Sequence, residues 1–190
     1  MEESSEIHLP QEESKKLSLF KNSLIHGCIL GGIIAFITFV LNLMGASDTL
    51  LTVFQFSFIA LIMASMFLGT KSYRENHLNG YISYGKAFWS TFLIGAISSI
   101  VVAAYMFVFY QIYPEEIIKI LEKVEEKFME NPDLKQEQLD MMMVYTKKFT
   151  TPFWIFLWSA LGNIFYSAIF GLIISIFVKK KDNSFESNFQ

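Results

Sequence analysis

Four long apolar runs without a charged side chain constrain this chain more than any other feature. They comprise Leu24–Met44, Leu50–Thr70, Ala87–Tyr113 and Phe153–Val178. The hydrocarbon core of a bilayer is about 30 Å thick and a helix rises about 1.5 Å per residue, so about 20 apolar residues suffice to cross it. Each run reaches that length. The sequence therefore predicts an all-α protein with four transmembrane helices.

Composition agrees with a membrane protein. Hydrophobic residues make up 53% of the 190 residues and charged residues only 17%, whereas soluble domains average about 25% charged residues. The charges gather in the tails and connections. Four spans and one long connection use up the chain, which leaves no room for a soluble catalytic domain.

The runs divide the chain into three parts. Residues 24–178 form the predicted membrane domain, with 1–23 as a polar, disordered cytoplasmic tail and 179–190 as a second cytoplasmic tail. Clustered charge and low hydrophobicity favour disorder at the N-terminus. The first run is about twice as long as the 7–15 residues typical of the apolar region of a signal peptide, which favours an uncleaved anchor over a cleaved signal.

The third connection, residues 114–152, is predicted to be a charged insertion of two helices. Ile117, Leu121, Val124 and Phe128 fall on one face of the first helix. Asn131-Pro132-Asp133 interrupts the pattern, and Asp133 is expected to cap the second helix.

The second helix of the insertion presents an apolar side of its own, and two arrangements of the pair stay open: a hairpin, or extensions of the spans. We expect the apolar faces to pack on each other and on the bundle rim. The alternative is partner docking, since methionine-rich faces adapt to varied partners. The residues concerned are Leu121, Phe128, Met142 and Met143.

The distribution of basic residues predicts the orientation. Nine of the 15 lysines and arginines lie in the two tails and the second connection, and the others lie in the insertion. The basic-rich side of a membrane protein faces the cytoplasm. We therefore expect both termini inside and the insertion outside.

Small residues recur every fourth position along three of the four runs. The series begin at Gly27 in the first run, at Thr91 in the third and at Ser159 in the fourth. Spacing of four places each series on one helix face, where small side chains let helices approach closely. Packing is the expected role, and the lining of a pore is the alternative.

Uncharged polar side chains mark where spans meet or where a solute would pass. An amide in lipid seeks a hydrogen-bond partner, so we expect these groups to fix helix register, with pore lining as the alternative. The predicted packing or pore-lining residues are Asn42, Gln55, Ser159, Asn163, Ser167 and Gly171.

The sequence predicts no catalytic centre, metal site or cofactor. His8, His26 and His77 are scattered, and none has a partner at metal-ligand spacing. No catalytic or phosphate-binding motif occurs. The spans lack the acidic and basic side chains that pumps and proton-coupled carriers need.

The segment Gly80-Tyr81-Ile82-Ser83-Tyr84-Gly85-Lys86-Ala87-Phe88 resembles a bacterial family of small four-span membrane proteins that is classed as a domain of unknown function. The similarity extends over most of residues 20–180, through a glycine-rich first span, a short first hairpin and Pro152 before the last span. It implies the four-span architecture and a bacterial inner-membrane location. It carries no functional residues.

Two functions follow as hypotheses. We expect a non-enzymatic membrane protein that acts through helix packing and protein contacts, with the lipid bilayer, a second copy or another membrane protein as partner, and no nucleic acid. The alternative is a passive channel or carrier for a small neutral solute, lined by Asn42, Gln55 and Asn163.

Overall fold

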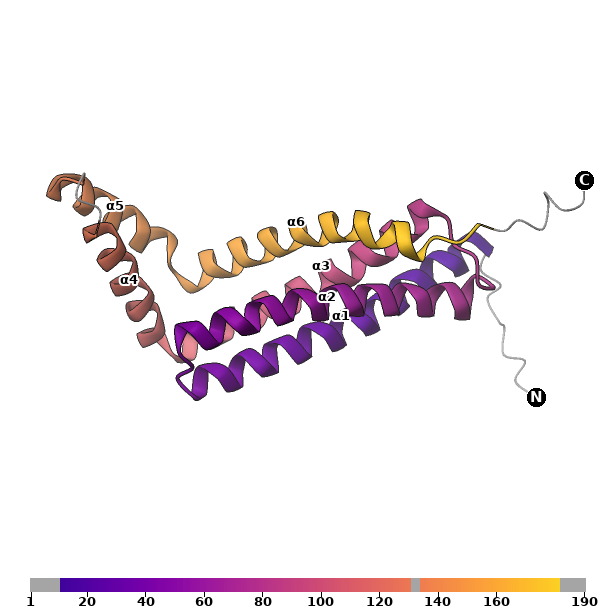
Figure 1. The fold of residues 1–190 in the computed structure, drawn as a ribbon, viewed down its shortest axis with the longest axis horizontal. Coiled ribbons are helices and arrows are strands. Elements are labelled where there is room, and N and C mark those ends of the chain that lie inside the picture. The colour runs from indigo at the N-terminus through magenta and orange to yellow at the C-terminus, as the bar shows by residue number, and fades with distance from the viewer. Residues whose placement is uncertain (1–10, 131–133, 182–190) are drawn as a thin grey trace, which may run out of the picture.

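A computed structural model describes residues 11–130 and 134–181. Within this part, the chain is helical apart from short connections (Figure 1). The helices are α1 (Gln11–Leu43), α2 (Asp48–His77), α3 (Tyr84–Ile112), α4 (Pro114–Met129), α5 (Gln136–Phe149) and α6 (Pro152–Val178). Asn131-Pro132-Asp133, with the predicted cap of the second insertion helix, lies outside the described residues.

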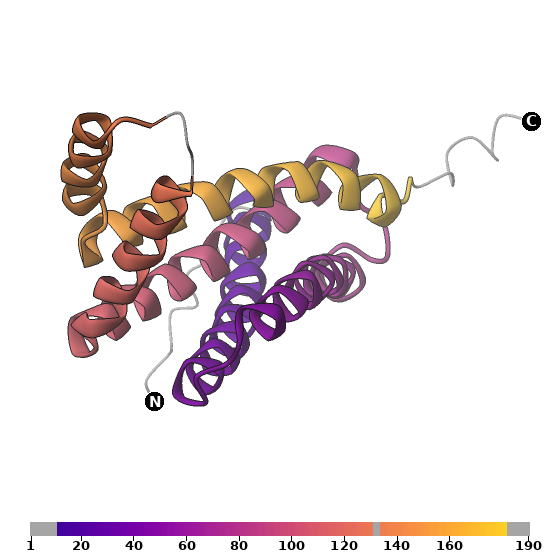
Figure 2. The same ribbon diagram turned by 60° about the vertical axis from the view of Figure 1, so that its left-hand side comes forward.

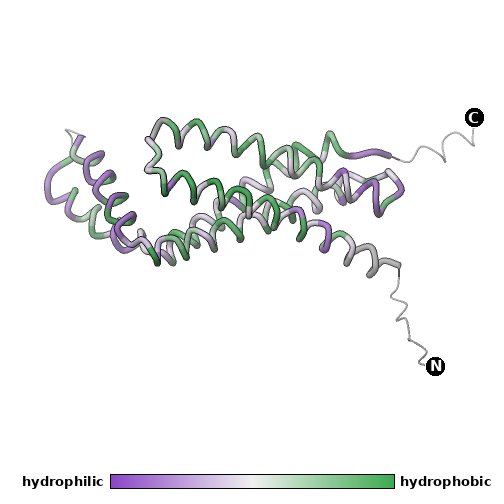
Figure 3. The backbone as a smooth tube through the Cα atoms, turned by 90° about the horizontal axis from the view of Figure 1, so that it is seen from below, coloured by the Kyte–Doolittle hydropathy of each residue, from purple (hydrophilic) through white to green (hydrophobic). Residues whose placement is uncertain are grey.

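Four of these helices are long and apolar enough to cross a membrane, as the sequence predicts, which indicates a multi-pass membrane protein. The candidate spans are Ser18–Leu43, Thr52–His77, Tyr84–Ile112 and Pro152–Val178. Hydrophobic residues follow the long helices in Figure 3, while hydrophilic residues gather at the helix ends and along the insertion. Because the number of spans is even, the start of α1 and the end of α6 lie at the same end of the molecule, opposite α4 and α5 (Figure 1).

The start of α1 differs from the prediction. The tail 1–23 was expected to be disordered, yet its described part, from Gln11 onward, is helical. Contacts with α2 explain the difference: Leu19 packs on the buried cluster at this end of the bundle, and Asn22 Nδ2 donates a hydrogen bond to the Gly69 carbonyl at 3.0 Å. Tertiary contacts therefore extend the helix beyond its apolar run.

Local signals explain the turns between the spans. The Leu50 N–H donates to Ser47 Oγ at 3.4 Å, so Ser47 caps α2. After α2 the backbone takes positive φ at Asn79 (52°) and Gly80 (85°), conformations that asparagine and glycine tolerate best. An Asn-Gly turn thus follows α2, which ends seven residues beyond the apolar run.

Helix α3 is the centre of the bundle. It packs most extensively on α6 and α1, whereas α2 makes fewer contacts with its neighbours. Figure 2 shows α3 running beside α6, with α1 crossing behind α3 and α2 farther from α6. Only 11% of the most apolar stretch of α2 is buried, against 39% of that of α3. The second span is therefore the most loosely attached.

Small residues allow the close contacts of α3. A Cβ added to Gly27 or Gly31 of α1 would lie 2.9 or 3.0 Å from a backbone carbonyl oxygen of α3. A Cβ added to Gly95 would lie 2.6 Å from Ser167 Cβ, and one on Gly171 would lie 3.1 Å from Thr91 Oγ1. The fourfold spacing read from the sequence thus supplies backbone approach between α1, α3 and α6.

The insertion forms a hairpin, because α4 contacts α5. Pro114 occupies the first turn of α4 and Glu115 follows it. Lys119 Nζ donates to Glu116 Oε1 at 2.6 Å, and this hydrogen bond and the negative charge of Glu116 raise the pKa of Lys119. At the start of α5 the Lys135 N–H donates to the Gln138 side chain at 3.1 Å.

The four predicted docking residues do not share one exposed surface. Met143 is buried, as is its neighbour Leu139. Leu121 and Phe128 are half-buried, whereas Met142 is exposed. This placement agrees better with packing inside the hairpin than with a surface for a partner.

Candidate intramembrane binding site

A cavity of about 720 Å³ lies among the four long helices. Every long helix contributes to its wall. The lining residues are Ile34, Thr38 and Leu41 of α1; Thr52, Phe54, Gln55, Phe58, Ile59 and Ile62 of α2; Gly95, Ser98, Ser99, Val102 and Met106 of α3; and Asn163, Tyr166, Ser167 and Phe170 of α6. This volume falls within the roughly 300–1,000 Å³ typical of small-molecule sites.

Bulky residues of α2 explain why the cavity exists. At Gly69, α2 lies close to its neighbours, since an added Cβ would be 2.8 Å from Ile94 Cδ1. Nearer the first connection, Phe58 and Ile62 pack on the cluster of α1 and α3 formed by Leu30, Ile34 and Val102. These large side chains take the place that small residues have in the α3–α6 contact. A space lined partly by α2 and partly by α6 remains between them.

The cavity is closed towards the termini and open between α2 and α6. At its floor, Met66 and Ile94 have no exposed surface, and Gly95 contacts Ser167. At the α2–α6 side, Gln55 and Asn163 are exposed. The cavity is therefore closed at the end near Met66 and Ile94.

Three hydroxyls of the lining are bonded to their own helices. Thr38 Oγ1 donates to the Ile34 carbonyl at 2.8 Å, Ser99 Oγ to the Gly95 carbonyl at 2.7 Å, and Ser167 Oγ to the Asn163 carbonyl at 2.7 Å. Such hydroxyls have satisfied their donor and present only lone pairs to the cavity.

Other polar groups of the lining have capacity for a ligand. Asn163 Nδ2 donates to Ser159 Oγ at 3.4 Å, which leaves its second amide hydrogen. The Gln55 amide and the Ser98 hydroxyl have no hydrogen-bond partner among the described residues, and Ser98 is only 4% exposed. An unpaired amide or hydroxyl away from water loses free energy, so a polar group of a solute or a water would be favoured here.

Aromatic rings cover the apolar part of the wall. Phe54 and Phe58 lie with ring centres 6.3 Å apart on α2, and Tyr166 stacks with Phe170 on α6 at 6.4 Å. No acidic or basic side chain occurs among the lining residues. The lining therefore suits a neutral molecule with an apolar body and one or two hydrogen-bonding groups.

The predicted site residues separate into two groups. Gln55, Asn163 and Ser167 line the cavity, and Ser159 adjoins it through Asn163. The others lie elsewhere: Gly171 is packed against Thr91 of α3, and Asn42 Nδ2 donates to Tyr105 Oη at 3.3 Å.

Sequence reasoning did not single out Ser98 or the aromatic wall. Their only signal was the recurrence of serine and phenylalanine in the spans, which does not distinguish cavity residues from packing residues.

Comparison with protein families identifies the chain. The model of a family described as "Protein of unknown function (DUF4199)" matches residues 25–180. The chain belongs to the DUF4199 family. The match covers most of the first span, the other three spans and the insertion, and it confirms the resemblance to a family of unknown function. No curated protein and no solved structure matches the chain.

Proposed function

We propose that this protein is a membrane-embedded binding protein that takes up a small neutral amphiphile from the bilayer into the cavity between α2 and α6. The observation that carries the proposal is the cavity itself, which places the unpaired Gln55 amide and Ser98 hydroxyl beside an aromatic wall at membrane depth. The molecule would be held by hydrogen bonds and apolar contact, and no chemical conversion is part of the proposal.

The blind floor favours binding or carriage over a passive channel. A channel needs a hydrated path through both halves of the bundle, whereas Met66 and Ile94 are fully buried below the cavity. A carrier would have to separate these residues during its cycle. The proposal thus retains the neutral solute of the sequence-based alternative, and it replaces Asn42 with Ser98 as a binding residue.

Crosslinking with a neutral photoreactive lipid tests the proposal. The purified full chain, reconstituted in phosphatidylcholine vesicles, would be irradiated with a monoacylglycerol that carries a diazirine, and the modified peptides mapped by mass spectrometry. We expect modification to concentrate on residues 54–62 and 163–170. Gln55→Leu with Asn163→Leu should reduce it there, whereas Asn42→Leu, outside the cavity, should not. Modification spread evenly over the lipid-facing helices would contradict the proposal.

Cysteine accessibility supplies a second, independent test. Cys28 is exposed on α1 and is the only cysteine of the chain, so it would first be replaced by alanine. In that background, Asn163→Cys should react with a small neutral maleimide, while Ser175→Cys, at a position with no exposed surface, should not. Reaction along the whole 159–175 face would indicate a pore instead. Reaction at neither position would contradict the presence of an accessible cavity.

Assembly with a second copy or another membrane protein is the second candidate function. The weak burial of α2 within the chain favours it, because a partner helix could cover this span. Phe56 of α2 and Phe177 of α6 are both exposed. Single cysteines at the two positions would distinguish the faces: assembly through α2 predicts disulfide-linked dimers at position 56 only.

A further inference from the structure

The end of the bundle at which α1 begins and α6 ends is strongly basic. We call it the terminal face; it comprises the end of α2, residues 78–83, the start of α3 and residues 178–181 together with the nearby part of α1. Among the side chains that the structure describes there, Glu75 is the only acid. The basic side chains are Lys21, Lys71, Arg74, Lys86, Lys179, Lys180 and Lys181.

Backbone contacts fix the last described residues on this face. The Ile82 N–H donates to the Lys180 carbonyl at 2.9 Å, and the Lys180 N–H donates to the Ile82 carbonyl at 3.0 Å. Arg74 Nη1 donates to the Val178 carbonyl at 2.9 Å, at the negative end of the α6 dipole. We call Arg74, Ile82, Val178 and Lys180 the terminal clasp. It ties the segment after α6 to the connection between α2 and α3.

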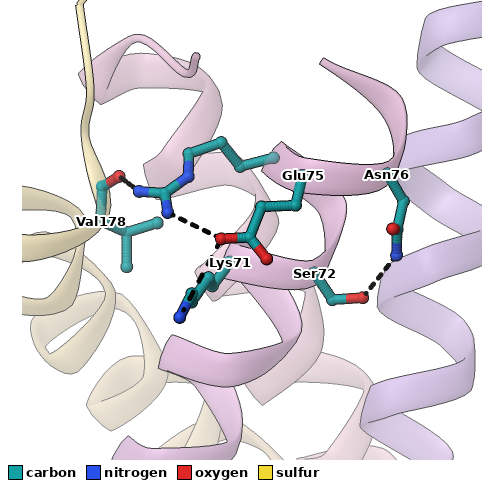
Figure 4. Close-up of polar contacts among 6 residues, drawn as sticks. Lys71, Ser72, Glu75, Asn76 and Val178 are labelled. Atoms are coloured by element: carbon teal, nitrogen blue, oxygen red, sulfur yellow. Dashed lines mark hydrogen bonds and ion pairs between the residues drawn. The ribbon is translucent and has the colours of Figure 1, made fainter. Parts of the chain in front are cut away.

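Glu75 neutralises only its own neighbours. Its Oε1 accepts from Arg74 Nη2 at 3.2 Å and lies 4.0 Å from Lys71 Nζ (Figure 4). Lys86 and the lysines at 179–181 are exposed and form no ion pair with the described residues. Their positive charge is therefore available to an external anion.

Aromatic residues place these lysines at the depth of lipid headgroups. The Lys180 ammonium lies 5.7 Å from the centre of the Tyr81 ring. Tyr81, with Tyr84 and Trp89 at the start of α3, is exposed. Tyrosine and tryptophan favour the boundary between hydrocarbon and water, so the ammonium groups lie where phosphates of the bilayer surface lie.

We propose that the terminal face binds the headgroups of anionic phospholipids, with Lys179, Lys180 and Lys181 as the main contacts and the terminal clasp holding them in place. An ammonium group donates strong, charge-assisted hydrogen bonds to phosphate oxygens. The clasp reduces the conformational freedom that these lysines would lose on binding, which strengthens the interaction. This site is separate from the cavity and does not depend on the proposed function.

Lipid titration of the purified full chain tests the proposal. The protein in mild detergent would be titrated with dioleoyl phosphatidylglycerol and, separately, with dioleoyl phosphatidylcholine, and bound lipids counted by native mass spectrometry. We expect the anionic lipid to bind in preference. Each basic residue near an anionic surface contributes about fivefold in affinity (roughly 1 kcal/mol). Replacing Lys179, Lys180 and Lys181 with glutamine should therefore weaken phosphatidylglycerol binding more than about tenfold and leave phosphatidylcholine binding unchanged.

Two matched variants distinguish the effect of the lysines at 179–181 from the effect of positive charge elsewhere on the protein. Replacing the same three lysines with arginine should keep the preference, which also shows that the segment tolerates substitution. Replacing Lys147 and Lys148, at the opposite end of the bundle, with glutamine should keep it as well. The proposal is overturned if the wild-type chain binds both lipids equally, if the two glutamine variants lose equal affinity, or if inorganic phosphate displaces phosphatidylglycerol at equal concentration, since the site would then be one for soluble phosphate.

Discussion

Replacing Gly95 with alanine should weaken the contact between α3 and α6. The new Cβ would lie 2.6 Å from Ser167 Cβ, whereas carbon atoms in contact lie at about 3.5–4.0 Å. The two helices would have to separate by roughly 1 Å at their tightest point. Overpacking of this kind costs about 1–3 kcal/mol, and the helix propensity of alanine returns about 1 kcal/mol. Because the obstructing atom is next to the backbone and cannot rotate away, we take the upper end of this cost, about 3 kcal/mol, and expect a net loss of about 2 kcal/mol.

Thermal unfolding in detergent, followed by tryptophan fluorescence at one scan rate, measures this effect. For a chain of this size 1 kcal/mol corresponds to about 2–4 °C, so the apparent Tm should fall by about 4–8 °C. The control is Gly162→Ala on α6, where no atom lies within 4 Å of an added Cβ, and its Tm should stay or rise. Adding Ser167→Gly to Gly95→Ala removes the side chain that the new Cβ would meet. The double variant should therefore recover most of the lost stability. An unchanged Tm for Gly95→Ala, or a double variant no more stable than the single one, would refute the packing argument.

Three further substitutions, two of them with a control substitution, probe the ends of the bundle and the hairpin. Arg74→Gln removes the hydrogen bond to the α6 terminus and should lower stability by about 1–3 kcal/mol, while Lys71→Gln, at an exposed ion pair, should change it by less than about 1 kcal/mol; apparent Tm in detergent compares the two. Met143→Ala should speed amide hydrogen exchange in residues 114–152 because it leaves a cavity at a buried position, and Met141→Ala, at an exposed one, should not. Ser47→Ala removes the cap of α2 and should cost about 1 kcal/mol, which faster exchange in the first turn of α2 would reveal.

The sequence is sufficient to predict the spans and the helix contacts of small residues. A bilayer imposes a minimum length on every apolar run, so the four spans follow from counting. Spacing of four in Gly27 and Gly31 requires both to lie on one helix face, and the structure places that face on α3. Both properties are local, which is why one sequence reveals them.

Features that depend on residues far apart in the chain were not predictable. Leu19 and Asn22 extend α1 through contacts with α2, and Ile82 pairs with Lys180 across almost a hundred residues. The amide of Gln55 was correctly noted as a polar group in a span. That it lines the same cavity as Asn163 depends on the distance between α2 and α6, which the packing of several large side chains sets.

The joint between α3 and α4 has a consequence for imaging this small protein. Tyr113 alone separates the two helices, and its ring lies 5.0 Å from that of Phe109 in the last turns of α3. A joint of one residue transmits orientation from one helix to the next. An antibody fragment raised against the hairpin would therefore report the direction of the central helix, and it would give particles of a chain of 190 residues a mark for alignment.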